Sequence, residues 1–160
     1  REKEDDALQG KFFASASPEA ISYGFYIERT KEPDLSRNDW DSFIAWLREP
    51  ENEAWFLETA KEQNLTLYDL KNTDPKETSF SGEILPKEEG WELSTKGEDI
   101  PNLADFLENL PQRRAIDLMI ARHVPKEEAA ARGADIANDI AGLFEILMPL
   151  YQAATSHFHR

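Results

Sequence analysis

Histidine, serine and carboxylate side chains are the groups in this sequence that could carry a reaction, and none falls in a catalytic pattern. The histidines are His123, His157 and His159, and no serine occupies a G-x-S-x-G nucleophile turn. A hydrolytic triad needs a nucleophile, a base and an orienting acid within reach of one another. No such trio is evident, so we assign no catalytic residue.

Carboxylates are so abundant that a pair of them carries little information. Asp135 and Asp139 could form an acid–base or metal-binding pair, but their spacing is also that of charges on a helix surface. A metal-dependent nuclease can be built from carboxylates and one lysine, and Glu83 with Lys87 is such a fragment. A turn between them would separate the two side chains. Calcium loops and glycine-rich phosphate loops are absent from the sequence, and we predict no metal and no cofactor.

The remaining candidates are aromatic and basic residues that could form a binding surface. Trp46 lies off the apolar stripe of its predicted helix, and Tyr26 points away from the apolar side of its predicted strand. Exposed aromatics anchor protein partners and stack on bases. The alternative is a second core layer beneath a helix. The candidate binding residues are Tyr26, Arg29, Trp46, Arg113, Arg114, Arg122 and His123.

Overall charge and composition limit the classes of partner. Lys and Arg number 18 and Asp and Glu 32, which gives a formal net charge of −14 over 160 residues. This charge opposes non-specific attraction to phosphate backbones, although a local basic patch could still bind nucleic acid. The sequence contains no cysteine and no run near the roughly 20 apolar residues of a membrane span. We expect a soluble, cytoplasmic protein.

Two strand pairs and several helices are predicted to position these residues. Apolar and polar residues alternate over 20–30, which with 11–17 predicts an antiparallel hairpin, and 80–85 with 90–95 predicts another. Apolar residues recur at helical spacing after Asn38, which can cap a helix. They recur again from Leu103, where Asn102 or Asp99 can cap another. Pro50 ends the first of these helices, and Asn52 or Glu51 can start another. Residues 65–70 are ambiguous between strand and loop.

The C-terminal third of the chain contains the most apolar strand candidate and a long helix. Residues 115–124 are apolar on both sides, which predicts a central strand covered on both faces. The helical pattern of residues 126–154 should bend or divide at Pro149, because proline removes a backbone donor and clashes with the preceding turn.

These elements predict an α+β fold with a mixed or mainly antiparallel sheet. Its two hairpins and central strand would pack against several helices, including the long C-terminal one. We expect residues 1–9 to form a charged, flexible leader, 10–156 a single domain and 157–160 a tail.

Three functional hypotheses follow. The first is a non-enzymatic protein-interaction or regulatory domain, standing alone or as part of a larger protein, whose partner is unknown. The second is a nucleic-acid-reading module of a defence or repair enzyme, which the net charge disfavours. The third is a metal-dependent hydrolase or nuclease that uses carboxylates only. A homo-oligomer could also form through the C-terminal helix if an apolar patch remains on it.

Overall fold

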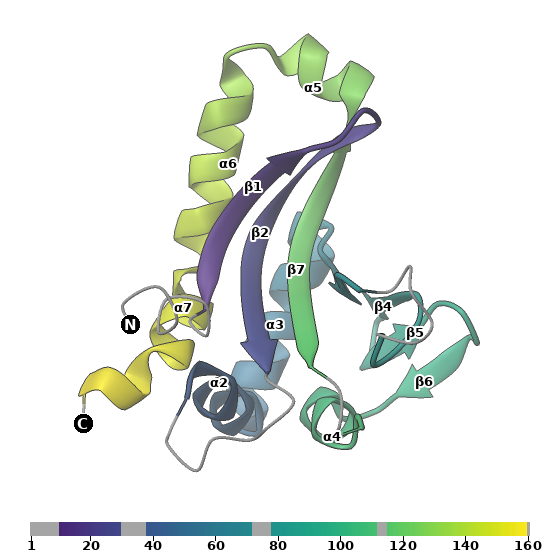
Figure 1. Ribbon diagram of the computed structural model, residues 1–160, viewed down its shortest axis with the longest axis vertical. Coiled ribbons are helices and arrows are strands. Elements are labelled where there is room, and N and C mark those ends of the chain that lie inside the picture. The colour runs from purple at the N-terminus through teal and green to yellow at the C-terminus, as the bar shows by residue number, and fades with distance from the viewer. Residues whose placement is uncertain (1–9, 30–37, 72–77, 112–114, 160) are drawn as a thin grey trace.

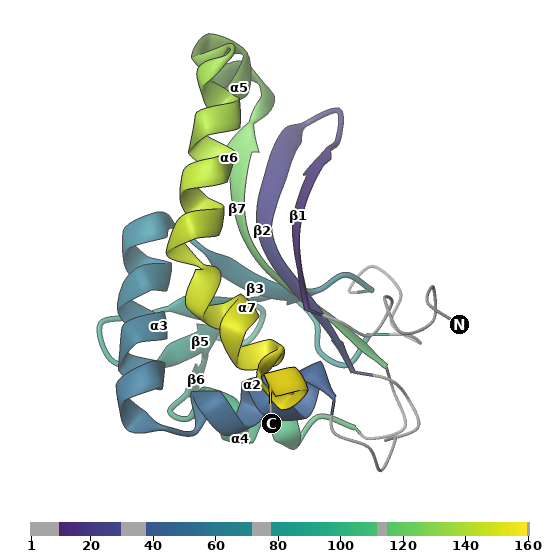
Figure 2. The same ribbon diagram turned by 90° about the vertical axis from the view of Figure 1, so that its left-hand side faces the viewer.

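The computed structural model describes residues 10–29, 38–71, 78–111 and 115–159. Their strands form one seven-stranded sheet in the order β1-β2-β7-β3-β4-β5-β6, and every neighbouring pair is antiparallel. Helices pack on one side of this sheet (Figures 1 and 2). The predicted α+β class, with a mainly antiparallel sheet, is confirmed.

The N-terminal hairpin forms as its alternating pattern predicts. β1 (Lys11–Ala16) pairs with β2 (Ala20–Arg29), and the backbone N–H of Ser17 donates to the carbonyl oxygen of Ala20 at 2.8 Å to close the turn. Alternate β2 side chains enter the core, because successive residues of a strand point to opposite faces. The buried set in β2 is Tyr23, Phe25 and Ile27.

β7 (Ile116–Pro125) is the central strand that the sequence predicts. It pairs along all 10 of its residues with β2, and on its other side with β3 (Thr66–Asp69), which resolves the ambiguous segment as a strand. Residues on both faces are buried, including Ile120 on the helix side and Ala121 on the other.

Gly24 allows β2 and β7 to approach each other closely. A Cβ atom built on this glycine would lie 2.0 Å from the backbone oxygen of Ile120, and its φ of +159° is one that other residues rarely adopt. Only glycine therefore fits this position without moving one of the two strands.

The second half of the sheet consists of short strands. β4 (Glu83–Pro86) and β5 (Trp91–Leu93) form the second predicted hairpin. β6 (Glu98–Ile100) was not predicted from the sequence, because a segment of 3 residues with two acidic side chains shows no readable period. It forms the edge of the sheet opposite β1.

Helices α2 (Asp39–Leu47), α3 (Pro50–Gln63) and α4 (Leu103–Glu108) lie near one end of the long strands (Figure 1). Both predicted caps are confirmed. The side chain of Asn38 accepts a hydrogen bond from the backbone N–H of Asp41 in α2, and that of Asn102 accepts one from Asp105 in α4. Pro50 occupies the first turn of α3.

The C-terminal helical segment forms three consecutive helices. α5 (Lys126–Arg132) ends at Gly133, whose φ is +57°, and α6 (Asp135–Ile146) follows. The predicted division near Pro149 is confirmed, because α7 (Met148–Ala154) begins there with proline in its first turn. The break at Gly133 was not predicted; glycine permits the backbone conformation that ends α5.

A short 3-10 helix, η1 (Ser156–His159), continues beyond α7. The side chain of His157 is paired with buried Asp39, at the start of α2. This contact joins the two ends of the described chain, since the backbone N–H of Gly10 donates to the same carboxylate. Across the described ranges, no helix has the length and apolarity that crossing a bilayer requires.

Substituting two glycines tests the close approach of β2 and β7. Gly24→Ala should lower the free energy of unfolding by about 2–3 kcal/mol, because the added methyl group meets backbone that cannot rotate away. Gly142→Ala is the matched control, since open space surrounds this position in α6 and alanine favours helix. It should raise the free energy of unfolding by about 0.5–1 kcal/mol in urea titrations. Equal effects of the two changes would contradict the packing described.

Candidate functional site

Neighbouring strands β1, β2, β7 and β3 turn one set of side chains away from the helices. We call this surface the helix-free face, because no described helix covers it (Figure 2). Strand register identifies its members as Lys11, Phe13, Ser15, Ser22, Gly24, Tyr26, Glu28, Thr66, Tyr68, Asp117, Met119, Ala121 and His123. It combines aromatic, small and charged residues.

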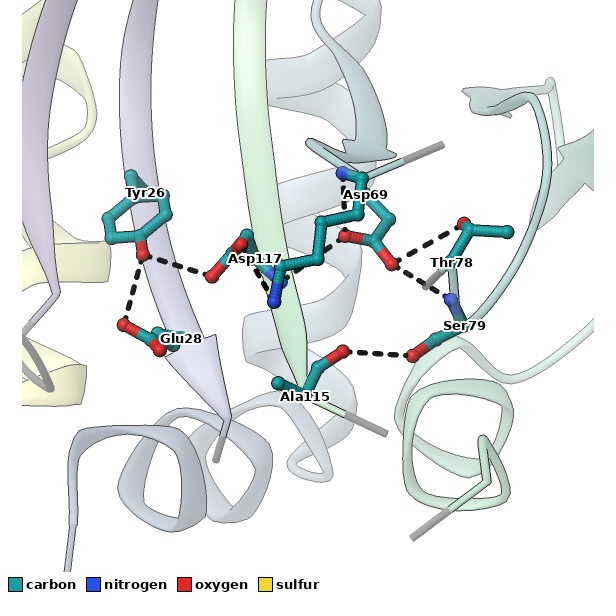
Figure 3. Close-up of polar contacts among 8 residues, drawn as sticks. Tyr26, Glu28, Asp69, Thr78, Ser79, Ala115 and Asp117 are labelled. Carbon is teal, nitrogen blue, oxygen red and sulfur yellow. Dashed lines mark hydrogen bonds and ion pairs between the residues drawn. The ribbon is translucent and has the colours of Figure 1, made fainter. Parts of the chain in front are cut away.

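A polar cluster occupies one end of this face (Figure 3). Glu28 on β2 lies directly opposite Asp117 on β7, an arrangement in which two like charges repel. The hydroxyl of Tyr26 lies between them, with its oxygen 3.1 Å from Glu28 Oε2 and 3.1 Å from Asp117 Oδ1. Tyrosine has one hydroxyl proton, so it can donate to only one of the two carboxylates at a time.

Lys71 makes the two carboxylates of this cluster unequal. Its Nζ lies 3.3 Å from Asp117 Oδ2, and no described cation forms an ion pair with Glu28. Burial raises the pKa of Glu28 most strongly, the hydrogen bond from Tyr26 lowers it, and the charge of Asp117 raises it further. Burial thus makes Glu28 a weaker acid than an exposed glutamate, and Asp117 is the carboxylate that is paired with a cation.

Tyr26 remains a hydrogen-bond donor throughout the physiological range. Burial, followed by the charges of Asp117 and Glu28, raises the pKa of its phenol well above the usual value. The phenolate is therefore inaccessible near neutral pH, and Tyr26 cannot serve as a base.

Asp69 joins the polar cluster to the loop segments on either side of it. This fully buried carboxylate accepts hydrogen bonds from the backbone N–H groups of Lys71 at 3.1 Å, Ser79 at 2.9 Å and Asp117 at 3.4 Å. The hydroxyl of Thr78 lies 3.4 Å from the carboxylate, but its one proton makes a shorter hydrogen bond to the carbonyl oxygen of Phe80, at 2.5 Å. With three backbone donors directed at it, Asp69 has a structural role.

Aromatic and hydroxyl groups occupy the other end of the helix-free face. Ser22 Oγ and His123 Nδ1 are hydrogen-bonded at 2.6 Å across β2 and β7. The ring of Tyr68 lies 5.3 Å from that of His123. No described acidic side chain is hydrogen-bonded to His123, so this pair lacks the orienting acid of a catalytic triad.

The structure separates the predicted binding residues between the two faces. Tyr26 and His123 lie on the helix-free face. Arg29, Trp46 and Arg122 lie on the helix side, packed among elements of the fold. Arg113 and Arg114 lie outside the described residues.

Arg122 connects the sheet to the end of α3. Its Nε donates to the carbonyl oxygen of Gln63 at 2.9 Å, and its Nη1 donates to the hydroxyl of Tyr23 at 3.1 Å. The guanidinium also lies over the Tyr23 ring, 5.6 Å from its centre. These contacts give Arg122 a structural role.

Arg29 and Trp46 also contact the protein itself. Arg29 Nη2 donates to the carbonyl oxygen of Pro111 at 2.6 Å, and the guanidinium lies 5.9 Å from the Trp40 ring centre. Trp46 is half-buried and packs edge-on against Trp55, with ring centres 5.9 Å apart. Trp46 thus packs against the core and α3, and a binding role for it stays a prediction.

The other members of the polar cluster are hard to predict from the sequence. Glu28 shares a strand face with Tyr26, and Asp117 interrupts an apolar strand, so both had a local signal in the alternation. Asp69 and Lys71 had none, because their partners lie far along the chain.

Among the residues described, no three or more His, Asp or Glu side chains gather in a way that could hold a metal ion.

No protein-family model, curated protein or solved structure matches this chain.

Removing the charge of Glu28 and removing that of Asp117 should change the free energy of unfolding in opposite directions. Glu28→Gln mimics the protonated acid that the fold favours, and should raise the free energy of unfolding at pH 7 by at most about 1 kcal/mol. The gain should disappear as pH falls through the raised pKa of Glu28 and then through the ordinary pKa of glutamate in the unfolded chain, because the wild-type side chain is then protonated in both states.

Asp117→Asn is the matched comparison for that change. It removes the partner of Lys71 and should lower the free energy of unfolding at pH 7 by about 1–2 kcal/mol. Urea titrations between pH 3 and pH 8 measure both effects. If Glu28→Gln lowered the free energy of unfolding at pH 7, the description of Glu28 as a carboxylate whose charge is disfavoured by burial would be wrong.

Proposed function

We propose that this chain is a protein-interaction module whose binding surface is the helix-free face. The observation that supports this proposal is the arrangement of side chains on that face. Phe13, Tyr68 and His123 lie there on β1, β3 and β7 without a described helix above them. The paired residues Gly24 of β2 and Ala121 of β7 are small and lie on the same face. Aromatic side chains are enriched at protein-binding surfaces.

The nucleic-acid hypothesis is less well supported. Sequence reasoning combined exposed aromatics with arginines, but Arg29 and Arg122 bind the protein's own carbonyl groups on the opposite side of the sheet from Tyr26. The cations on the helix-free face are few, and the net charge of −14 repels phosphates.

A carboxylate-based hydrolase is the second candidate, because Glu28 and Asp117 converge on one hydroxyl and burial raises the pKa of Glu28. The pairing of Asp117 with Lys71 and the three backbone donors to Asp69 argue for a structural cluster instead. Loss of a measured hydrolytic activity in Glu28→Gln would favour this candidate.

The partner we propose is an extended protein segment that contains lysine or arginine. Its cations would be attracted by the acidic chain and would find the ring faces of Phe13 and Tyr68 and the carboxylate of Glu28. The cysteine-free sequence agrees with an assignment to the cytoplasm, a reducing compartment.

Selection from a random peptide library tests this function. Bound peptides should be enriched in Lys and Arg, and His123→Ala and Tyr68→Ala should each weaken binding about tenfold or more. Tyr151→Ala is the matched control, because it removes a 40 % exposed aromatic from the helix side and should leave binding unchanged. Isothermal titration with a selected peptide measures the three variants.

Two outcomes would contradict the proposal. One is failure to enrich any peptide above a library selected without protein. The other is equal binding of peptide to wild type and to both helix-free-face variants. Salt-sensitive binding of labelled single-stranded oligonucleotides at low ionic strength would instead favour the nucleic-acid module.

A further inference from the structure

β1 is an edge strand without the usual protection against further pairing. Among the described strands it pairs only with β2, in an unbroken register of 6 residues without a bulge. Edge strands are normally protected by charged residues, proline or bulges. β6, at the opposite edge, is 3 residues long and carries exposed Glu98 and Asp99, whereas β1 after Lys11 contains only Phe, Ala and Ser.

An apolar patch adjoins this edge on the helix side. Ile146, Met148 and Tyr151 are 40 %, 38 % and 40 % exposed, and only Leu70 joins them as a large exposed hydrophobic residue in the described part of the chain. The Tyr151 ring lies 5.7 Å from that of Phe12 in β1, so patch and strand form a continuous surface. Adjacent apolar patches and open strand edges mark sites of association.

Charge distinguishes this surface from the rest of the chain. Residues 12–18 and 146–156 contain no Asp, Glu, Lys or Arg, although such residues make up 31% of the sequence. Two copies that each carry a charge of −14 repel one another except where they can meet without charged side chains. This uncharged strip is therefore suited to a second copy more than to a basic partner.

We infer that two copies of this chain associate through antiparallel pairing of β1 with β1, which extends the sheet across a two-fold axis. An antiparallel edge is complementary to itself, as a two-fold interface requires. Paired residues must share a face, which centres the register on Phe13 or on Ala14. In the register centred on Phe13, Lys11 lies opposite Ser15 of the second copy. In the register centred on Ala14, Lys11 lies opposite Ser17. Like charges are therefore not paired in either register.

This inference does not rest on the proposed function, because it uses the strand edge and the helix side of the sheet. Light scattering measures it directly: the mass should rise from 18.3 kDa toward twice that value as concentration increases. Ala14→Lys would place two ammonium groups near the axis, and Met148→Lys would charge the patch. Each should raise the dimer dissociation constant about tenfold or more. Both positions are exposed, so the fold should persist.

Cysteine cross-linking locates the axis without background, because the natural chain has no cysteine. Under mild oxidation, Ala14→Cys should form a disulfide-linked dimer in one register and Phe13→Cys in the other. Glu98→Cys on β6 is the control, exposed at the opposite edge, and should remain monomeric.

Two results would overturn the inference. One is a monomeric mass at several hundred micromolar protein. The other is a dimer that neither cysteine cross-links and that Ala14→Lys leaves intact, since it would use another surface. Variants at His123 and Tyr68 should dimerise normally, which separates failure of the dimer from failure of peptide binding.

Discussion

The pairing of β7 with strands on both sides is the constraint on which the rest of the molecule depends. Its 10 residues hold the N-terminal hairpin on one side and β3 on the other. Alternate residues of β7 point to opposite faces of the sheet. Leu118 and Ile120 are buried on the side that the helices cover, whereas Asp117 and His123 belong to the helix-free face. A one-residue slip of β7 would exchange the two sets, burying the polar residues and exposing the core.

Polar residues on the two faces have different structural roles. On the helix side, Arg122 takes a position where alternation calls for an apolar residue, and Gln63 and Tyr23 satisfy its donors. On the opposite face, Tyr26 separates two carboxylates that would otherwise repel each other. The polar side chains named above are hydrogen-bonded within the protein. The partly exposed rings of the helix-free face are therefore the groups available for contact with other molecules.

Patterns among neighbouring residues are sufficient to predict much of the fold, but they are not sufficient to predict the candidate site. The alternation in β2 and the caps at Asn38 and Asn102 are properties of neighbouring residues, so the sequence predicts them. β6 is too short to show a period, and the stop at Gly133 competes with a helical pattern that continues on both sides. The polar cluster joins residues as far apart as Tyr26 and Asp117, whose contact depends on strand order and register. For the same reason, the sequence could not show that Arg122 lies on the opposite face from Tyr26.

Strand order also determines when the sheet can be completed during synthesis. The strand that belongs between β2 and β3 is the last to be made, so a ribosome must translate through Pro125 before either strand gains its central neighbour. Until then, the nascent chain carries two apolar strands with open edges, which are prone to mispairing. Contacts over such sequence distances also slow folding, because a long loop must close before its stabilising contacts form. Because β7 is inserted between earlier strands, the described sheet cannot be complete until β7 has left the ribosome.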